Sequence, residues 1–179
     1  LNIIERSVKQ IRAFTEKTNR SLSPKLAGDD IRSSSDLISE ALETVKNTKV
    51  THVNIRVEAV EDVLLVCDSQ NIVEVLHNII VNGIEAITSK GEISISTYFN
   101  KKSFCIEIAD NGTGISEDQI KQIFKPFYTT KRNNVNFGIG LSYCKSVMQA
   151  HGGTIEVYSI KNKGTRMVLR FPLKLVRRK

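Results

Sequence analysis

The 179-residue sequence has no tryptophan, and aromatic residues make up only 6% of it. Proteins that bind single-stranded nucleic acid stack bases on aromatic side chains that are interleaved with basic ones. We therefore do not expect nucleic acid to be the partner, although the chain has a net charge of +7. A basic surface suits an anionic nucleotide or an acidic protein equally well, so the charge alone does not identify a ligand.

Cysteine is also scarce: Cys67, Cys105 and Cys144 are far apart and form no Cys-x-x-Cys pair. This argues against a disulfide framework or a zinc site and favours reduced thiols in a cytosolic setting. No apolar run is long enough to predict a membrane-spanning helix, and no signal-peptide pattern opens the sequence. We therefore expect a cytoplasmic location. Because the first residue is Leu1, we also expect a fragment whose natural N-terminus lies elsewhere.

The composition is ordinary for one globular domain with a short appendage, with 40% hydrophobic and 25% charged residues. Residues 1–22 predict an amphipathic helix with a narrow apolar stripe. The stripe consists of Ile4, Val8, Ile11 and Phe14. One helix cannot bury such a stripe alone, so it needs a partner helix. Residues 23–30 contain a proline and a glycine and predict a linker, which divides the chain into residues 1–28 and 29–179.

The body of the chain alternates helical and strand patterns. We expect helices at residues 36–46, 71–88, 117–124 and 138–150. We expect strands at residues 52–57, 63–67, 92–99, 103–109, 154–159 and 165–172. This order predicts an α+β fold, a two-layer sandwich in which helices cover one face of a mixed, mostly antiparallel sheet. Asp36 is the expected N-cap of its helix, and the basic residues from Lys174 to Lys179 are expected to fray in solvent.

The segment from Asp110 to Gly114, Asp-Asn-Gly-Thr-Gly, follows an alternating strand pattern. A carboxylate at the end of a buried strand can accept a hydrogen bond from an exocyclic amine. The two glycines let a flat ring or phosphates approach the backbone closely. The same five residues also suit an ordinary turn, so the segment alone leaves both interpretations open.

The helix expected at residues 71–88 has two different faces. At 100° per residue, Asn78, Asn82 and Glu85 lie on the side opposite to an apolar face. Amide oxygens one turn apart suit Mg²⁺ that is held jointly with substrate phosphates. A solvated polar face is the alternative, although asparagine is a poor helix former.

A third segment, Gly138 to Leu141, opens the last helix with two glycines. Free backbone N–H groups at a helix N-terminus can meet phosphate, and the helix dipole adds to this attraction. The preceding polar residues 129–134 are typical of a lid that folds over a polyphosphate, or of a simple charged loop.

Taken together, these segments resemble the catalytic ATP-binding domain of bacterial sensor histidine kinases. The wider superfamily, often called GHKL ATPases and built on the Bergerat fold, includes gyrase, a mismatch-repair ATPase and a heat-shock chaperone. The resemblance rests on five motifs in order: an asparagine box at 76–86, a glycine box at 110–115, a phenylalanine box at 123–131, a second glycine box at 138–141 that continues to 151–153, and Gly164-Thr165.

The resemblance implies ATP and Mg²⁺ as cofactors, with Asn78, Asn82 and Lys131 as the catalytic residues and Asn82 as the metal ligand. The other implied nucleotide-binding residues are Asp110, Gly112, Gly114, Ile115, Glu85, Phe127, Thr130, Gly138, Ile139, Gly140, Leu141 and Thr165. It implies further partners: a dimerisation domain of the same protein that carries the phosphorylated histidine, a response-regulator receiver domain, and a second copy in a homodimer. The cytoplasmic part of a membrane-bound sensor would fit the same pattern.

The sequence departs from this family in two respects. Asn136 replaces a further glycine before the second glycine box, a position at which asparagine also tolerates left-handed backbone angles. None of His52, His77 and His151 stands where an acceptor histidine is expected. We therefore expect residues 1–22 to be the second helix of a dimerisation hairpin, and we expect the chain to bind ATP without phosphorylating itself. An ATPase clamp of the same superfamily, or a nucleotide-binding module without catalysis, are the alternatives.

Overall fold

The computed structural model describes residues 30–46, 52–130 and 138–179. The predicted N-terminal helix, most of the predicted linker and the lid from residue 131 onward lie outside the described residues. The division into residues 1–28 and 29–179 therefore stays a prediction. Within the described ranges, no helix combines the length and the apolar character that crossing a bilayer requires.

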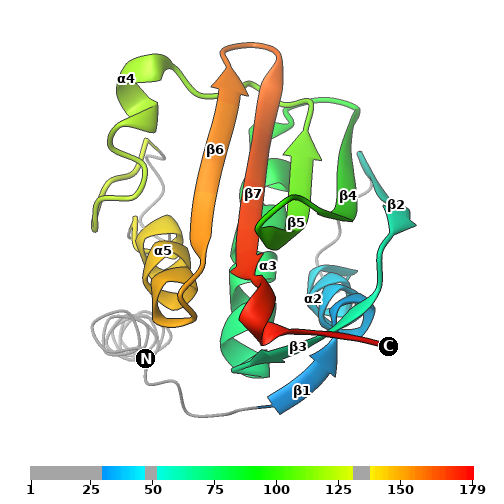
Figure 1. Ribbon diagram of the computed structural model, residues 1–179. Helices are drawn as coiled ribbons and strands as arrows, with labels where there is room; N and C mark the ends of the chain where they lie inside the picture. The colour runs from blue at the N-terminus through cyan, green and yellow to red at the C-terminus, as the bar shows by residue number, and fades with distance from the viewer. Residues whose placement is uncertain (1–29, 47–51, 131–137) are drawn as a thin grey trace, which may run out of the picture.

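The described chain forms two layers, a five-stranded sheet and the helices that cover one of its faces (Figure 1). The strands lie in the order β2 (Val53–Val60), β4 (Gly91–Phe99), β5 (Ser103–Asp110), β7 (Gly164–Pro172) and β6 (Thr154–Ile160). Strand β2 is parallel to β4, and the other neighbouring pairs are antiparallel. The predicted fold class is confirmed.

The two faces of this sheet differ because side chains alternate along each strand. Ile93 and Ile95 of β4 are fully buried beneath the helices. On the opposite face, Arg170 of β7 binds Glu156 of β6 with both carboxylate oxygens, at 2.8 and 2.9 Å. Cross-strand ion pairs of this kind suit a face on which the described residues place no helix.

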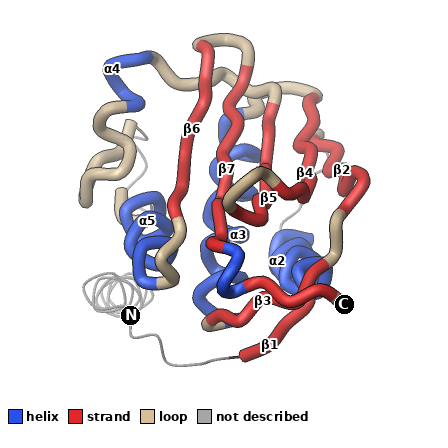
Figure 2. Tube along the Cα trace, viewed as in Figure 1, coloured by secondary structure: helices blue, strands red, loops and turns tan. Residues whose placement is uncertain are grey.

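The helices are α2 (Ser34–Lys46), α3 (Ser69–Ala86), the single turn α4 (Glu117–Ile120) and α5 (Gly140–Ala150). Figure 2 shows α3 between α2 and α5 behind the sheet. The predicted N-cap Asp36 is wrong. Helix α2 starts two residues earlier, where Ser33 Oγ accepts from the Asp36 N–H at 3.4 Å and Asp62 accepts from the Ser35 N–H at 3.2 Å. Helix α4 is also shorter than the predicted 117–124.

A second, smaller sheet has the order β1 (Asp30–Ser33), β3 (Val63–Cys67) and β8 (Val176–Arg178). The sequence predicted only β3, and the prediction of a fraying C-terminal end is wrong. Strand β8 pairs antiparallel with β3, and the Lys179 ammonium group reaches the Asp62 carboxylate. The basic end is therefore tied to the same carboxylate that holds the start of α2.

Candidate functional site

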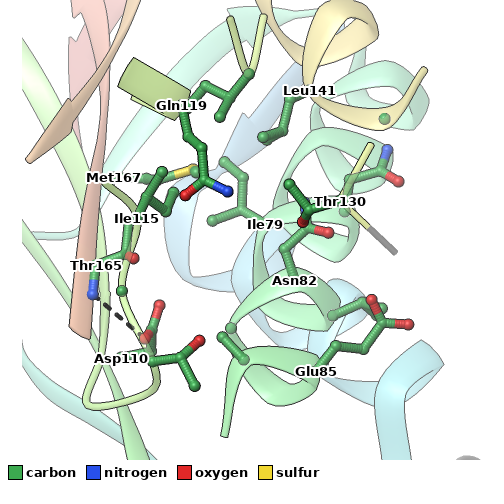
Figure 3. A pocket seen from close by; sticks show the side chains of 18 of the residues that line it. Ile79, Asn82, Glu85, Asp110, Ile115, Gln119, Thr130, Leu141, Thr165 and Met167 are labelled. Atoms are coloured by element: carbon green, nitrogen blue, oxygen red, sulfur yellow. Dashed lines mark hydrogen bonds between the residues drawn. The ribbon is translucent and has the colours of Figure 1, made fainter. Parts of the chain in front are cut away.

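A cavity of about 670 Å³ lies between α3 and the helix-facing side of the sheet (Figure 3). Its walls come from five segments that are distant in the sequence: α3, the loop after β5, the segment from α4 to Thr130, the start of α5, and the β6–β7 hairpin. A volume of this size suits a ligand as large as a nucleotide.

One wall is the polar face of α3. Asn78, Asn82 and Glu85 line the cavity there, because the apolar face of the same helix is buried against the core. The start of α5 lies close to this wall: a Cβ atom placed on Gly140 would be 3.4 Å from Asn78 Oδ1. Asn78 and the first turn of α5 therefore share one end of the cavity.

Asp110, the last residue of β5, lies at the other end of the cavity. Its Oδ1 accepts from the Gly112 N–H at 2.9 Å and from the Thr165 N–H at 3.3 Å, the bond drawn in Figure 3. Neither bond uses Oδ2. Burial raises the pKa of this carboxyl, and the two backbone hydrogen bonds oppose that rise. The site thus holds a partly desolvated carboxylate with one oxygen fixed by the protein.

The two glycines after Asp110 serve different purposes. Gly114 has φ +62°, and a Cβ there would be 2.2 Å from the Ile160 carbonyl oxygen. Gly112 does not line the cavity, and a Cβ there would be 2.6 Å from the Ala86 carbonyl oxygen. The loop therefore passes directly over the end of α3, where the Thr113 N–H also donates to that oxygen at 2.9 Å.

The start of α5 closes the cavity on the side of the asparagines. Gly138 has φ +69°, and Gly138, Ile139, Gly140 and Leu141 all line the cavity. The N-cap residue Ile139 provides no side-chain hydrogen bond to the first turn. The first backbone N–H groups of this eleven-residue helix are thus available to an anion, toward which the helix dipole also points.

The structure places most of the predicted site residues around this cavity and leaves a few elsewhere. Ile115, Thr130 and Thr165 line it, together with the residues of α3 and α5 already described. Phe127 is 61% exposed with φ +65° and is not among the lining residues. Lys131 lies outside the described residues.

Several lining residues were not predicted from the sequence, among them Gln119, Lys161, Asn162 and Met167. The signal for Gln119 was a capping box, Ser116-x-x-Gln119, at the start of α4. Gln119 Oε1 accepts from the Ser116 N–H at 3.1 Å, so the amide nitrogen is the atom left to face the cavity, as Figure 3 shows. No local pattern could have pointed to the others, because the strand register brings them there.

The amide pair on α3 fits Mg²⁺ by its chemistry. Asparagine oxygens are ligands of the hard type that Mg²⁺ prefers, and Mg²⁺ commonly completes its shell with water and substrate phosphates. Among the described residues, no group of three or more His, Cys, Asp or Glu side chains gathers as an all-protein metal site. A side-chain oxygen on this face, that of Asn82 above all, would therefore suit a metal held together with a bound phosphate, with Asn78 beside it.

One of the three histidines has a clear structural role. His151 is 5% exposed; its Nε2 accepts from the Asp68 N–H at 3.0 Å, and its Nδ1 donates to the Val147 carbonyl at 2.7 Å. Both ring nitrogens are thus used to join the end of α5 to the N-cap of α3, as expected for a structural residue. His77 contacts the Thr44 hydroxyl through Nδ1 at 2.8 Å.

Comparison with known proteins gives a family match over the residues that line the cavity. The family described as histidine kinase-, DNA gyrase B-, and HSP90-like ATPase matches residues 67–175. Sensor histidine kinase ZraS of Escherichia coli O157:H7 is 36% identical over 111 residues, which cover 62% of this chain and 24% of that protein. Sporulation kinase D of Bacillus subtilis (strain 168) is 28% identical over 175 residues, 96% of this chain and 34% of that protein. This chain thus spans about a quarter to a third of these curated relatives.

Solved structures give the same result. The catalytic domain of the histidine kinase ThkA superposes with a TM-score of 0.67 at 26% identity, covering 80% of this chain and 95% of that one. The mycobacterial sensor histidine kinase MprB gives a TM-score of 0.73 and covers 84% of this chain and 99% of that one. At 20% identity, the second match shows a likeness of fold.

Proposed function

The chain belongs to the family of histidine kinase-, DNA gyrase B- and HSP90-like ATPases, and from this premise we propose that it binds Mg-ATP and transfers the γ-phosphoryl group to a histidine. The acceptor lies outside the described residues, on a dimerisation domain of the same protein. Phosphoryl transfer requires little covalent chemistry from the protein, so catalysis consists mainly of positioning and of charge stabilisation.

One observation carries the proposal: an acceptor for a base and donors for phosphates lie at opposite ends of one cavity. Asp110 Oδ2 accepts from the exocyclic amine of adenine. The backbone N–H groups at the start of α5 donate to the phosphate oxygens, which carry the negative charge that a helix N-terminus favours.

Residues between the two ends orient the ligand. Ile115 and Met167 line the cavity near Asp110 and provide an apolar surface for a purine ring. Asn82 would hold Mg²⁺, which would supply neutralisation of phosphate charge. Asn78, one turn earlier on α3, orients a phosphate oxygen or a water molecule beside it. Lys131 is a further candidate for phosphate contact.

The proposal also covers the longer protein to which this domain would belong. By analogy with its relatives, we expect a homodimer whose dimerisation helices carry the acceptor histidine, a receiver domain of a response regulator as the next phosphoryl acceptor, and a cytoplasmic location. His151 is no candidate acceptor, since it is buried with both ring nitrogens hydrogen-bonded.

Calorimetric titration with ATP and ADP, with and without Mg²⁺, tests the binding step. We expect binding that Asp110→Asn weakens for both nucleotides, and an Mg²⁺-dependent gain that Asn82→Ala removes. Incubation with radiolabelled ATP should leave no acid-labile phosphate on the 179-residue chain, and adding the dimerisation domain of the whole protein should produce it there. Absence of nucleotide binding would refute the proposal.

A further inference from the structure

Three polar residues occupy one row across the sheet at the base end of the cavity. Asp110 on β5 is paired with Thr165 on β7, and Thr165 is paired with Ser159 on β6. Directly paired residues on antiparallel strands project to the same face. Asp110 and Thr165 line the cavity, whereas Ser159 stands behind them as the next member of the row.

The hydroxyl of Ser159 makes three contacts whose directions can be deduced. The Ile115 N–H can only donate, and it lies 2.8 Å from Ser159 Oγ. The Gly164 carbonyl can only accept, and it lies 2.8 Å from the same oxygen. A serine hydroxyl has one proton, so that proton is used on Gly164. The third contact, with Thr165 Oγ1 at 2.9 Å, must therefore be one in which Thr165 donates.

We propose that Ser159 fixes the direction of the Thr165 hydroxyl and thereby makes the Asp110–Thr165 pair, at the base end of the cavity, an acceptor-only surface. With its proton held by Ser159, Thr165 Oγ1 presents only lone pairs toward the cavity. An ionised Asp110 likewise has no proton to donate. Ser159 is thus a positioning residue: it touches no ligand and acts through Thr165.

An acceptor-only surface selects among purines. The 6-amino group of adenine offers donors to Asp110 and Thr165, either directly or through one bound water. A 6-oxo purine places a carbonyl oxygen at the same point, which would face acceptors alone. Leaving a buried polar group without a partner is more costly than the net gain from one hydrogen bond, so the fixed proton direction favours ATP over ITP. The inference rests on the proposed nucleotide function and names a determinant of its base specificity.

The test compares the dissociation constants of ATP and ITP for the 179-residue chain and its variants. Ser159→Ala frees the Thr165 hydroxyl to rotate and donate to a carbonyl. We expect the preference for ATP over ITP to fall about five- to tenfold, which corresponds to one neutral hydrogen bond. Ser94→Ala, a change on β4 away from the cavity, serves as the control and should keep the preference.

A double-mutant cycle with Thr165→Val separates positioning from general packing. If Ser159 acts through Thr165, adding Ser159→Ala to Thr165→Val should leave the ATP-to-ITP ratio unchanged. Ser159→Thr, which keeps a hydroxyl, should retain the original ratio. A Ser159→Ala variant that weakens ATP and ITP equally would overturn the inference, because that outcome indicates a structural role alone.

The two proposals fail in different ways. If the unaltered chain binds neither nucleotide, the proposed function fails. If it binds ATP more tightly than ITP and Ser159→Ala keeps that ratio, only the role of Ser159 fails. If Ser159→Ala does not fold, as judged by a thermal melt, Ser159→Cys can replace it, because a thiol keeps the side-chain shape with a much weaker hydrogen-bonding group. The preference for ATP over ITP should then fall as expected for Ser159→Ala.

Discussion

Replacement of Asp110 by asparagine reverses one hydrogen-bonding group in the proposed base site while keeping the side-chain shape. The asparagine oxygen can still accept from the Gly112 and Thr165 N–H groups, so the loop after β5 should keep its course. The amide nitrogen then stands where Oδ2 was and points a donor at the adenine amine. Loss of a charge-assisted hydrogen bond is worth about 1.5–3 kcal/mol, or about 10- to 150-fold in affinity.

The effect on stability should have the opposite sign. Burial raises the pKa of Asp110 in the folded state, so its ionised form costs free energy at neutral pH. A group with a raised folded-state pKa contributes stability below its unfolded pKa of about 4, and that contribution is lost as pH rises through the folded pKa. Asp110→Asn without nucleotide should therefore melt at the same temperature as the parent or higher at pH 7, and the difference should shrink below pH 4.

Calorimetry with ATP, ADP and ITP checks the expected loss of affinity. Thermal melts of the nucleotide-free protein check the expected effect on stability. ITP carries a carbonyl where ATP carries the amine, so Asp110→Asn should lose far more affinity for ATP than for ITP. A variant that binds ATP within twofold of the parent would refute this account of Asp110. A variant that unfolds would show instead that the carboxylate is needed for the fold.

Further predictions concern Gln119, Asp62 and the thiols. Gln119→Leu should weaken binding of ADP about five- to tenfold by calorimetry, because it removes an amide donor that faces the cavity, whereas Gln122→Leu on the same segment should not. Burial opposes ionisation of Asp62, but hydrogen bonds from Lys179 and the start of α2 outweigh it and lower its pKa. The contribution of Asp62 to stability should thus be present above pH 4 and lost as pH falls. In urea titrations, Asp62→Ala should lower the free energy of unfolding by about 1–2 kcal/mol. Burial raises the pKa of Cys67 to about 11, so this thiol should react with a disulfide reagent only when the protein is unfolded.

Short-range patterns were enough to predict the parts of the molecule that depend on neighbours in sequence. The polar face of α3 and the glycines at the start of α5 follow from helix periodicity and from the special backbone needs of glycine. Asp110 follows from its place at the end of an alternating strand. Their order along the chain supported the resemblance to histidine kinases, and the family and fold agree with it.

Features that depend on distant pairing could not be predicted in this way. Asp62 caps α2 from another loop and binds Lys179, which is 117 residues away, so neither the true start of α2 nor strand β8 has a local signature. Ser159 looks like any strand serine until the register places it beside Thr165. Lys161 and Asn162 of the β6–β7 hairpin likewise reach the cavity only because of how these strands pair.

The central claim is that one cavity holds the base at Asp110 and the phosphates at the start of α5, and amide NMR spectra test it most directly. Adenosine should shift the amide signals of Gly112 and Thr165, whose N–H groups bond to Asp110, and should leave Gly140 and Leu141 nearly unchanged. ADP should shift all four. Shifts of the α5 amides by adenosine alone, or ADP shifts confined to a different surface, would contradict the account.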